Sequence, residues 1–317
     1  MSTQDTLDVP APRAMLERRA PATIRTHRTP TLSIVIPAHN EATTLRRGLQ
    51  ALASAAVDEV PEVVVVANGC TDDTAEVARA AGVEVVELDE ASKSAALRAG
   101  DVVAGAFPRI YLDADITLLP GTLDALARSL REGDLLAASP HVQFDTSSCS
   151  WAVRAFYAAY RELPYVREGL VGLGVYGMSR EGRTRFAEFP DVTSDDLFVQ
   201  RLFAEHERGT SGGAFVVDVP KDLRNLLKVR VRTAAGNAQL SAAEPAATST
   251  GLAGTDAAVP ERFARTTSST SSALLKLVVR RPALIPSLAV YTAVTVASRV
   301  LARTGRGSAW QRDSSTR

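Results

Sequence analysis

Two aspartates at the end of an apolar run are the groups in this chain best placed to do chemistry. Tyr111-Leu112 leads directly into Asp113-Ala114-Asp115. A strand that ends in this way presents two carboxylates at the carboxyl edge of a sheet, where open α/β sheets bind ligands. Such close carboxylates repel each other unless a cation neutralises them. Mg²⁺ and Mn²⁺ suit the pair, because they bind one or two carboxylates together with substrate phosphates. A strand running into an Asp-rich turn is the alternative interpretation.

Two polar clusters follow other apolar runs. Residues 37–41 come directly after the first run, and Asn40 can cap the helix that follows, whose free N–H groups attract anions or nucleotide oxygens. Residues 67–73 follow the second run, and the amide of Asn68 offers the donor and the acceptor needed to read a base edge. An ordinary helix start also explains the first cluster.

Three further clusters carry charge. Lys93 begins a predicted helix and can meet a phosphate, or it can be a solvated surface charge. Asp195 and Asp196 precede another helix, whose dipole would stabilise them, and a carboxylate there can also take a proton from an attacking hydroxyl. In residues 228–232, Arg230 and Arg232 lie on the same side if the segment is extended, where guanidinium groups can hold a diphosphate. A solvated basic face is the alternative for this last segment.

Short apolar runs alternate with helical periodicity from residue 32 onward. Four strands separated by helices predict a parallel, doubly wound sheet with right-handed crossovers. These strands are expected at 32–36, 63–66, 83–88 and 109–112. Further on, helices are expected near 123–130, 151–160 and 197–203, an apolar run at 135–138, a strand at 215–219, and a glycine-rich strand or loop close to a ligand at 169–178.

The overall composition excludes some classes of function. The 317 residues carry 36 Lys and Arg against 36 Asp and Glu, a formal net charge of +0, which indicates neither a nucleic-acid binder nor a strongly acidic partner. Cys70 and Cys149 are too few and too far apart for a disulfide framework, which favours a reducing, cytoplasmic compartment. Residues 1–30 lack the apolar segment of a signal peptide, and their aperiodic mixture predicts a disordered lead-in.

The C-terminal part of the chain changes composition twice. Residues 241–272 are mostly Ala, Ser, Thr and Gly, which predicts a flexible linker. Residues 273–304 are strongly apolar, and their core at 282–300 is close to the length that a membrane-spanning helix needs; a tail, 305–317, follows. Basic residues flank the core on both sides, as suits a helix lying on anionic lipid. A span, an interfacial helix and a helix packed on the domain all stay open.

The order of these motifs resembles that of family 2 glycosyltransferases with the GT-A fold, in which helices flank a doubly wound, mostly parallel sheet. The resemblance covers residues 31–236 and predicts one catalytic domain at 31–240. It rests on five segments in sequence: 34–41 (IVIPAHNE), 65–74 (VVANGCTDDT), 93–100 (KSAALRAG), 113–115 (DAD) and 194–202 (SDDLFVQRL).

The resemblance implies inverting transfer of a sugar from a nucleotide-diphosphate sugar to an acceptor hydroxyl. Asp195, six residues before Arg201, would deprotonate the acceptor, with Asp196 in reserve. Asp115 would ligate Mn²⁺ or Mg²⁺, which would neutralise the leaving diphosphate, and Asp113 would lie toward the ribose and the metal. The remaining implied residues are Pro37, His39 and Glu41 around the nucleotide, Asn68 near its base, and Gly172, Gly174 and Gly177 in the floor under donor sugar and acceptor.

The chain departs from the family pattern in ways that bear on its substrates. Ala67 and Asn68 stand where many members have two acids, so the usual base contact is altered. Uridine is the default base, and guanosine stays open. Ser94 replaces an expected glycine. Residues 229–233 keep the Arg but lose the Gln and Trp of the Gln-x-x-Arg-Trp signature of processive synthases. Single addition is therefore expected.

Three other functions compete with this one. A sugar nucleotidyltransferase would need a phosphate loop rich in glycine and arginine, where this chain has residues 37–41. A degenerate transferase that only binds nucleotide or glycan would explain the altered acids. Transfer to a polyprenyl phosphate would need no base, because that acceptor is already ionised. The favoured setting, by family analogy, is glycan or glycolipid assembly at the cytoplasmic face of a membrane, contacted through residues 273–304.

Overall fold

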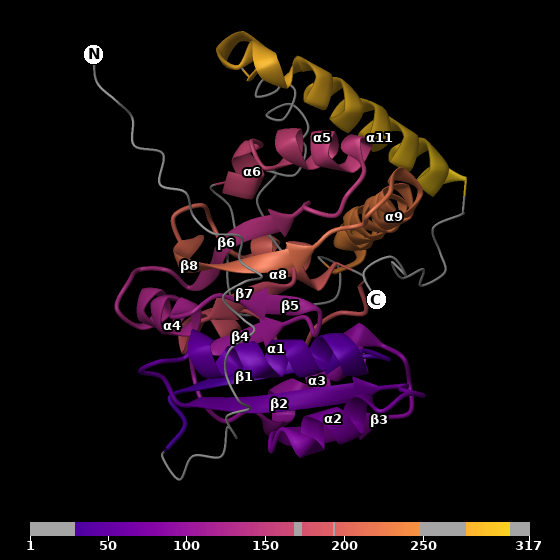
Figure 1. Ribbon diagram of the computed structural model, residues 1–317. Helices are drawn as coiled ribbons and strands as arrows, with labels where there is room; N and C mark the ends of the chain where they lie inside the picture. Colours follow the sequence, from indigo (N-terminus) through magenta and orange to yellow (C-terminus); the bar gives the residue numbers. More distant parts are fainter. Residues whose placement is uncertain (1–28, 168–172, 193, 248–276, 305–317) are drawn as a thin grey trace.

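The computed structural model describes residues 29–167, 173–192, 194–247 and 277–304. Within these ranges eight strands form one sheet in the order β3-β2-β1-β4-β7-β6-β8-β5 (Figure 1). β1 is parallel to β2 and β4, and β2 is parallel to β3, whereas β7 runs antiparallel to β4 and β6. The strands are β1 Leu32–Ala38, β2 Pro61–Asn68, β3 Glu84–Leu88, β4 Arg109–Leu112, β5 Ile116–Leu118, β6 Ala137–Asp145, β7 Val175–Met178 and β8 Arg208–Asp218.

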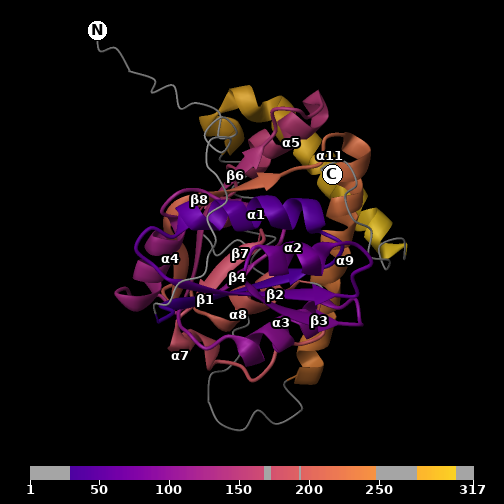
Figure 2. The same ribbon diagram turned by 60° about the horizontal axis from the view of Figure 1, so that its bottom comes forward.

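Helices cover both faces of the parallel part of this sheet. Figure 2 shows α1 and α2 on one side of β1 and β2, and α3 on the other. The helices are α1 Ala42–Ala55, α2 Thr74–Ala80, α3 Lys93–Val103, α4 Thr122–Arg131, α5 Trp151–Tyr160, α6 Pro164–Arg167, α7 Arg180–Arg183, α8 Asp195–Leu202, α9 Leu223–Ala247 and α11 Ile285–Arg303, with the short 3₁₀ helix η3 Pro282–Leu284 before α11. The predicted doubly wound, mostly parallel sheet flanked by helices is confirmed.

Alternation along the strands explains why both faces are covered. Ile34 and Ile36 pack under α1, whereas Val35 faces α3, and all three are buried. A strand apolar on both faces has to be covered on both. Gly100 lets α3 approach β1, because a Cβ at that position would lie 2.3 Å from Cγ1 of Val35.

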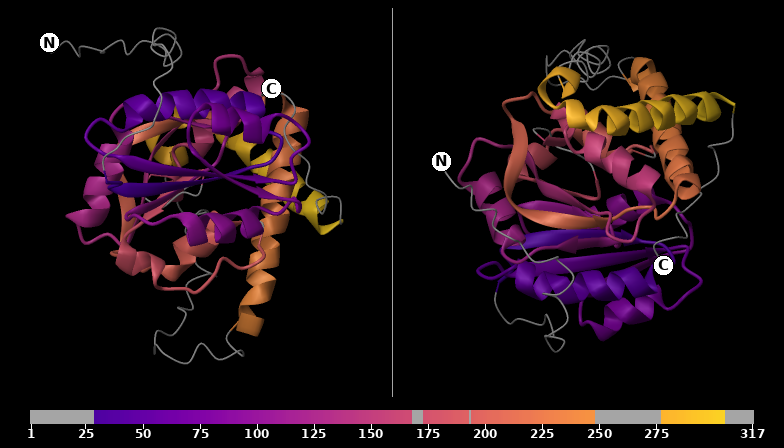
Figure 3. Two further views of the ribbon diagram at one scale, coloured as in Figure 1. Left: turned by 90° about the horizontal axis from the view of Figure 1, so that it is seen from below. Right: turned by 45° about the horizontal axis from the view of Figure 1, so that its top comes forward.

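A third apolar cluster lies outside the sheet, where α5, α9 and α11 meet. Phe156 and Tyr160 of α5 pack with Tyr291 of α11 in this cluster. Figure 3 shows α11 lying across α5 and α9. Pro282–Arg303 is long and apolar enough to cross a membrane, with a mean hydropathy of 1.5, by length and composition alone. The predicted C-terminal apolar helix is thus present, and it is packed on the domain along one side.

Several local predictions are wrong, and others concern residues outside the described ranges. Asn40 does not cap α1: it has a φ of 52°, its side chain accepts hydrogen bonds from Thr71, and Glu41 is the residue preceding the helix. The segment 228–232 is helical rather than extended, since it lies within α9. α9 also continues to Ala247, seven residues into the expected linker 241–272. The rest of that linker, the tail 305–317 and nearly all of the lead-in 1–30 lie outside the described residues.

Candidate functional site

One lysine joins the two acidic clusters that the sequence singles out. The ammonium nitrogen of Lys93 lies 2.7 Å from Oδ1 of Asp113 and 2.9 Å from Oδ1 of Asp195. Asp113 follows β4, Lys93 is the first residue of α3 and Asp195 the first of α8. The carboxyl ends of the parallel strands and the starts of the helices that follow them lie at the same sheet edge, and so residues far apart in sequence meet there. The prediction that Lys93 meets a phosphate stays untested, because here it contacts two carboxylates.

Asp195 is the most enclosed acid of this group. Its side chain is 7% exposed, and its second carboxylate oxygen, Oδ2, accepts a hydrogen bond of 2.9 Å from the hydroxyl of Tyr176. Asp196 is half-buried, and its carboxylate accepts a hydrogen bond from the backbone N–H of Leu197 at the start of α8. Asp195 therefore faces the lysine and Asp113, whereas Asp196 has a contact with its own helix.

The carboxylates lie close enough together to shift one another's pKa. Burial raises the pKa of Asp113; Lys93 opposes this rise and Asp195 adds to it. Desolvation by the surrounding protein and the charge of Asp113 raise the pKa of Asp115 to about 6, although the residue is exposed. Burial and the charge of Asp195 raise the pKa of Asp196 to about 7. Burial lowers the pKa of Lys93, but the attraction of Asp113 and Asp195 outweighs it, so the net shift is upward and the amine stays charged.

These shifts allow a test of whether a divalent cation fits. Carboxylates whose pKa is raised by crowding gain from an added positive charge nearby. Among the described residues no three His, Cys, Asp or Glu side chains gather closely enough to hold a metal ion by themselves. Asp113 and Asp115 supply two carboxylates, which is the number Mg²⁺ or Mn²⁺ takes from a protein when substrate phosphates provide further ligands. Asp113 and Asp115 therefore fit a metal ion that binds together with a diphosphate. The Asp113 carboxylate would then contact both the metal ion and Lys93.

The expected nucleotide residues lie at the ends of β1 and β2. The Nδ1 atom of His39 is 2.6 Å from the backbone oxygen of Asn68, and the amide of Asn68 donates a 2.8 Å hydrogen bond to the backbone oxygen of Ala38. Asn68 is only 2% exposed, and Pro37 is buried within β1. Glu41 is half-buried, and its backbone N–H donates to the hydroxyl of Thr74. The N–H₂ group of Asn68 thus ties β1 to β2, and the contact of this amide with a base stays a prediction.

The two arginines expected to act together are separated. In a helix, residues two positions apart point about 200° away from each other, so Arg230 and Arg232 do not share a face. The guanidinium carbon of Arg230 lies 5.7 Å from the ring centroid of Phe156 and 5.4 Å from that of Tyr160, in the outer cluster. Arg232 is close enough to the acids that its charge opposes the rise in the pKa of Asp113. Of the pair, Arg232 is the one that the structure brings to the acids.

The glycines expected in the floor of the site have different surroundings. Gly172 lies outside the described residues. Gly174 has a φ of +100° and its backbone oxygen accepts from the N–H of Asp113; a Cβ there would lie 2.7 Å from Ile116 and 3.3 Å from the Asp113 carboxylate. A Cβ on Gly177 would instead lie 2.8 Å from Leu130 of α4, in the core. Gly174 therefore lies beside Asp113, whereas at Gly177 the missing side chain makes room for α4; a floor under donor sugar and acceptor stays a prediction.

Sequence reasoning missed Tyr176 and the direct pairing of Lys93 with Asp195. Tyr176 belongs to a strand of only four residues, next to Gly177 in a glycine-rich stretch. The only signal available was alternation, which places Tyr176 on the face opposite Gly177. No local pattern shows that the Tyr176 hydroxyl meets Asp195, which lies 19 positions further along the chain.

Comparison with known proteins finds a matching family and solved structures of similar fold. The model of the family "Glycosyl transferase family 2" matches residues 33–178. The mannosyltransferase PcManGT from Pyrobaculum calidifontis, solved with GDP-Man and Mn²⁺, is 22% identical and aligns over 93% of this chain and 93% of its own, with a TM-score of 0.56. Glucosyl-3-phosphoglycerate synthase from Mycobacterium tuberculosis, solved with Mn²⁺, UDP and glucosyl-3-phosphoglycerate, is 24% identical over 58% of this chain and 70% of its own, with a TM-score of 0.45. No curated protein matches the sequence.

Proposed function

Because the chain is a glycosyltransferase of family 2 with the GT-A fold, we propose that it transfers a sugar, with inversion, from a nucleotide-diphosphate sugar to an acceptor hydroxyl. The observation that carries this proposal is the contact of one ammonium group with Asp113 and Asp195. Asp113, which we propose for the donor side, thus lies next to Asp195, which we propose as the base. Bond formation needs a donor carbon and an acceptor oxygen side by side, and this juxtaposition supplies a group for each.

Each side chain has a separate task in the proposed reaction. Asp113 and Asp115 would hold Mn²⁺ or Mg²⁺, which as a Lewis acid stabilises the charge of the leaving diphosphate. Asp195 accepts the proton of the attacking hydroxyl as the acceptor oxygen bonds to the sugar. Lys93 remains cationic throughout and holds the Asp195 carboxylate in place beside the donor. Arg232 adds a second cation on the side of Asp113.

The donor and the acceptor are proposed by class. A UDP-sugar is the default donor; the mannosyltransferase of similar fold was solved with GDP-Man, which keeps a GDP-sugar open. The acceptor is proposed to be a glycan or glycolipid in cell-surface glycan assembly, and a single sugar is added because residues 229–233 lack the Gln and Trp of processive synthases.

The direct test is release of nucleoside diphosphate from a panel of UDP-, GDP- and dTDP-sugars, with Mn²⁺, with Mg²⁺ and with a chelator. Simple sugars, phosphoglycerate and polyprenyl phosphate are offered as acceptors. We expect one donor to be cleaved and the chelator to abolish the release of its nucleoside diphosphate. Cleavage of no donor under any of these conditions would contradict the transferase proposal. Metal-dependent nucleotide binding without cleavage would instead identify a degenerate binding protein.

We also propose that the protein works at the cytoplasmic surface of a membrane, which it contacts through α11. The exposed side of α11 carries large apolar residues: Ile285, Val296 and Val300 are about half exposed. Exposed arginines, Arg299 and Arg303, flank this face near its C-terminal end. An apolar face with basic flanks matches a surface of anionic lipid, in which the helix lies flat while Leu288 and Tyr291 stay packed on the domain.

Vesicle sedimentation tests this contact. The intact chain should sediment with vesicles of mixed phosphatidylglycerol and phosphatidylcholine, and less so as salt is raised. The double variant Val296→Asp, Val300→Asp should lower the partition coefficient about tenfold or more, because two apolar side chains are lost from the lipid and two negative charges are added. Val102→Asp is the matched control, since Val102 is 87% exposed on α3. Sedimentation that is equal for all three proteins would leave α11 as a packing helix only.

A further inference from the structure

Two tyrosines on neighbouring strands form a buried pair beside the site. Tyr111 of β4 and Tyr176 of β7 are direct partners in the antiparallel register, and their rings stack with centroids 5.1 Å apart at an interplanar angle of 25°. Both residues are at least 97% buried. Their hydroxyls donate to different acids: Tyr111 to Asp101 at 2.6 Å, and Tyr176 to Asp195 at 2.9 Å.

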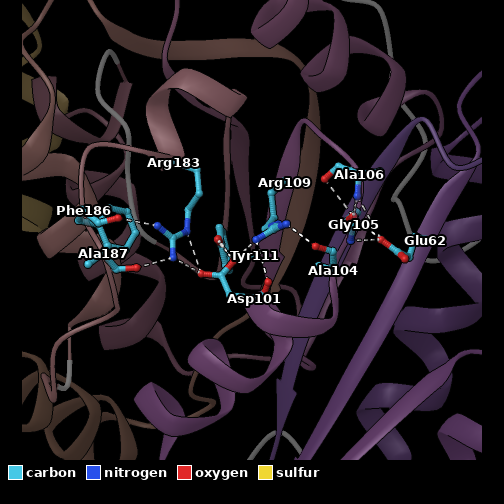
Figure 4. Close-up of polar contacts among 11 residues, drawn as sticks. Glu62, Asp101, Ala104, Gly105, Ala106, Arg109, Tyr111, Arg183, Phe186 and Ala187 are labelled. Carbon is cyan, nitrogen blue, oxygen red and sulfur yellow. Dashed lines mark hydrogen bonds and ion pairs between the residues drawn. The ribbon is translucent and has the colours of Figure 1, made fainter.

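The end of the pair away from the site is firmly anchored. Figure 4 shows Asp101 between two arginines, with the Tyr111 hydroxyl on the same carboxylate. Arg109 contacts Asp101 at 2.6 Å, and Arg183 contacts it at 2.6 Å and 2.8 Å. Phe189 meets the Tyr111 ring edge-on at 5.0 Å between centroids. A ring packed in this way has little freedom, and so the partner ring of Tyr176 rests on a rigid support.

The other end fixes the orientation of the proposed base. Each oxygen of the Asp195 carboxylate has its own donor: Lys93 on Oδ1 and Tyr176 on Oδ2. A lysine reaches its partner through a flexible stem, whereas a tyrosine has two torsions and here a stacked ring. Burial raises the pKa of the Tyr176 hydroxyl well above its ordinary value, as does the nearby charge of Asp195, so the phenol keeps its proton and donates it as a hydrogen bond.

We propose that Tyr176 is a positioning residue, which holds the Asp195 carboxylate at the angle from which it accepts the proton of the attacking hydroxyl. A carboxylate has about four acceptor sites, so two of them remain for the acceptor when Lys93 and Tyr176 occupy one each. The proposal rests on the proposed function, in which Asp195 is the base. In addition, we propose that the sheet sets the orientation of the Asp195 carboxylate, because Tyr176 belongs to β7.

Steady-state kinetics of nucleoside diphosphate release from the cleaved donor test the proposal. Tyr176→Phe keeps the ring and removes the hydroxyl, and we expect kcat to fall about tenfold, the size of a lost hydrogen bond to a charged group, with KM for the donor within about twofold of the wild type. Tyr111→Phe is the matched control, because it removes the hydroxyl of the other stacked ring. It also removes a hydrogen bond to a buried carboxylate, that of Asp101. It should leave kcat within about twofold. Equal losses of kcat in both variants would show a general packing effect and overturn the proposal.

A double-mutant cycle shows whether Tyr176 acts through Asp195. In the Asp195→Asn background, Tyr176→Phe should cost no more than about twofold in kcat, since the group it orients is no longer a base. A tenfold loss in both backgrounds would overturn the positioning role while leaving the transferase intact. If Asp195→Asn alone is without effect, the base assignment itself fails, and the positioning role fails with it.

Discussion

Replacing Asp195 by Asn is expected to lower the rate of transfer to a hydroxyl acceptor by about 10²- to 10⁴-fold, the usual contribution of a general base. The amide has nearly the shape of the carboxylate but cannot accept a proton from the attacking oxygen. It also removes the negative charge that pairs with Lys93 at 2.9 Å. Donor KM should change little, because Asp113 and Asp115 remain. Turnover and donor KM are measured with the donor identified in the panel.

Asp196→Asn provides the matched control for this prediction. Asp196 is adjacent, acidic and half-buried, with a pKa raised to about 7, but its carboxylate accepts a hydrogen bond from the N–H of Leu197. We expect it to lower the rate by less than about tenfold. If Asp196→Asn had the larger effect, the base would be Asp196. Near-normal turnover in both variants would indicate an acceptor that is already ionised, such as a polyprenyl phosphate.

Replacing Asp115 by Ala is expected to lower metal-supported release of nucleoside diphosphate by about 10²- to 10³-fold, the size of a lost electrostatic contact to a developing charge. The remaining acid of the pair, Asp113, is already engaged by Lys93 at 2.7 Å, and so a cation would keep only a shared carboxylate. The Mn²⁺ concentration for half-maximal nucleotide binding should rise in parallel. Release is followed by a coupled assay, and binding by calorimetry with nucleoside diphosphate and Mn²⁺.

Asp134→Ala is a suitable control, because Asp134 is an exposed aspartate in the segment after α4. It should be indistinguishable from the wild type in both assays. Release that resists a chelator and is unchanged in Asp115→Ala would refute the metal role of the pair. The charge on the leaving diphosphate would then have to be met by the cations Lys93 and Arg232.

The sequence predicted the architecture well where the elements are regular. The four apolar runs are β1 to β4, and the helices expected at 123–130, 151–160 and 197–203 correspond to α4, α5 and α8. Runs such as 63–66 are apolar and β-branched because the sheet is buried on both faces, a property that can be read along the chain. The short strand β5 escaped prediction, since three residues are too few to show a period.

The prediction failed where a local pattern had two structural solutions. Alternating charges at 228–232 fit a strand, but they also occur in a helix, and α9 turns Arg230 toward Phe156 while Arg232 stays on the side of the acids. Asn40 had the chemistry for a helix cap, but its side-chain oxygen accepts from Thr71 in the loop after β2 instead. The N–H₂ group of Asn68 bonds to the backbone oxygen of Ala38, and its contact with a base stays a prediction.

By itself the sequence determined the order of the elements, the family and the carboxylates at the strand and helix ends, because these depend on periodicity and on neighbours within a few positions. Only the tertiary structure decided that Lys93 joins Asp113 to Asp195, and that Tyr176 holds the second oxygen of Asp195. The reason is physical: the enclosed Asp195 has to be matched by donors, and which donors reach it depends on strand order and helix placement. Those are properties of the assembled sheet, and no single segment contains them.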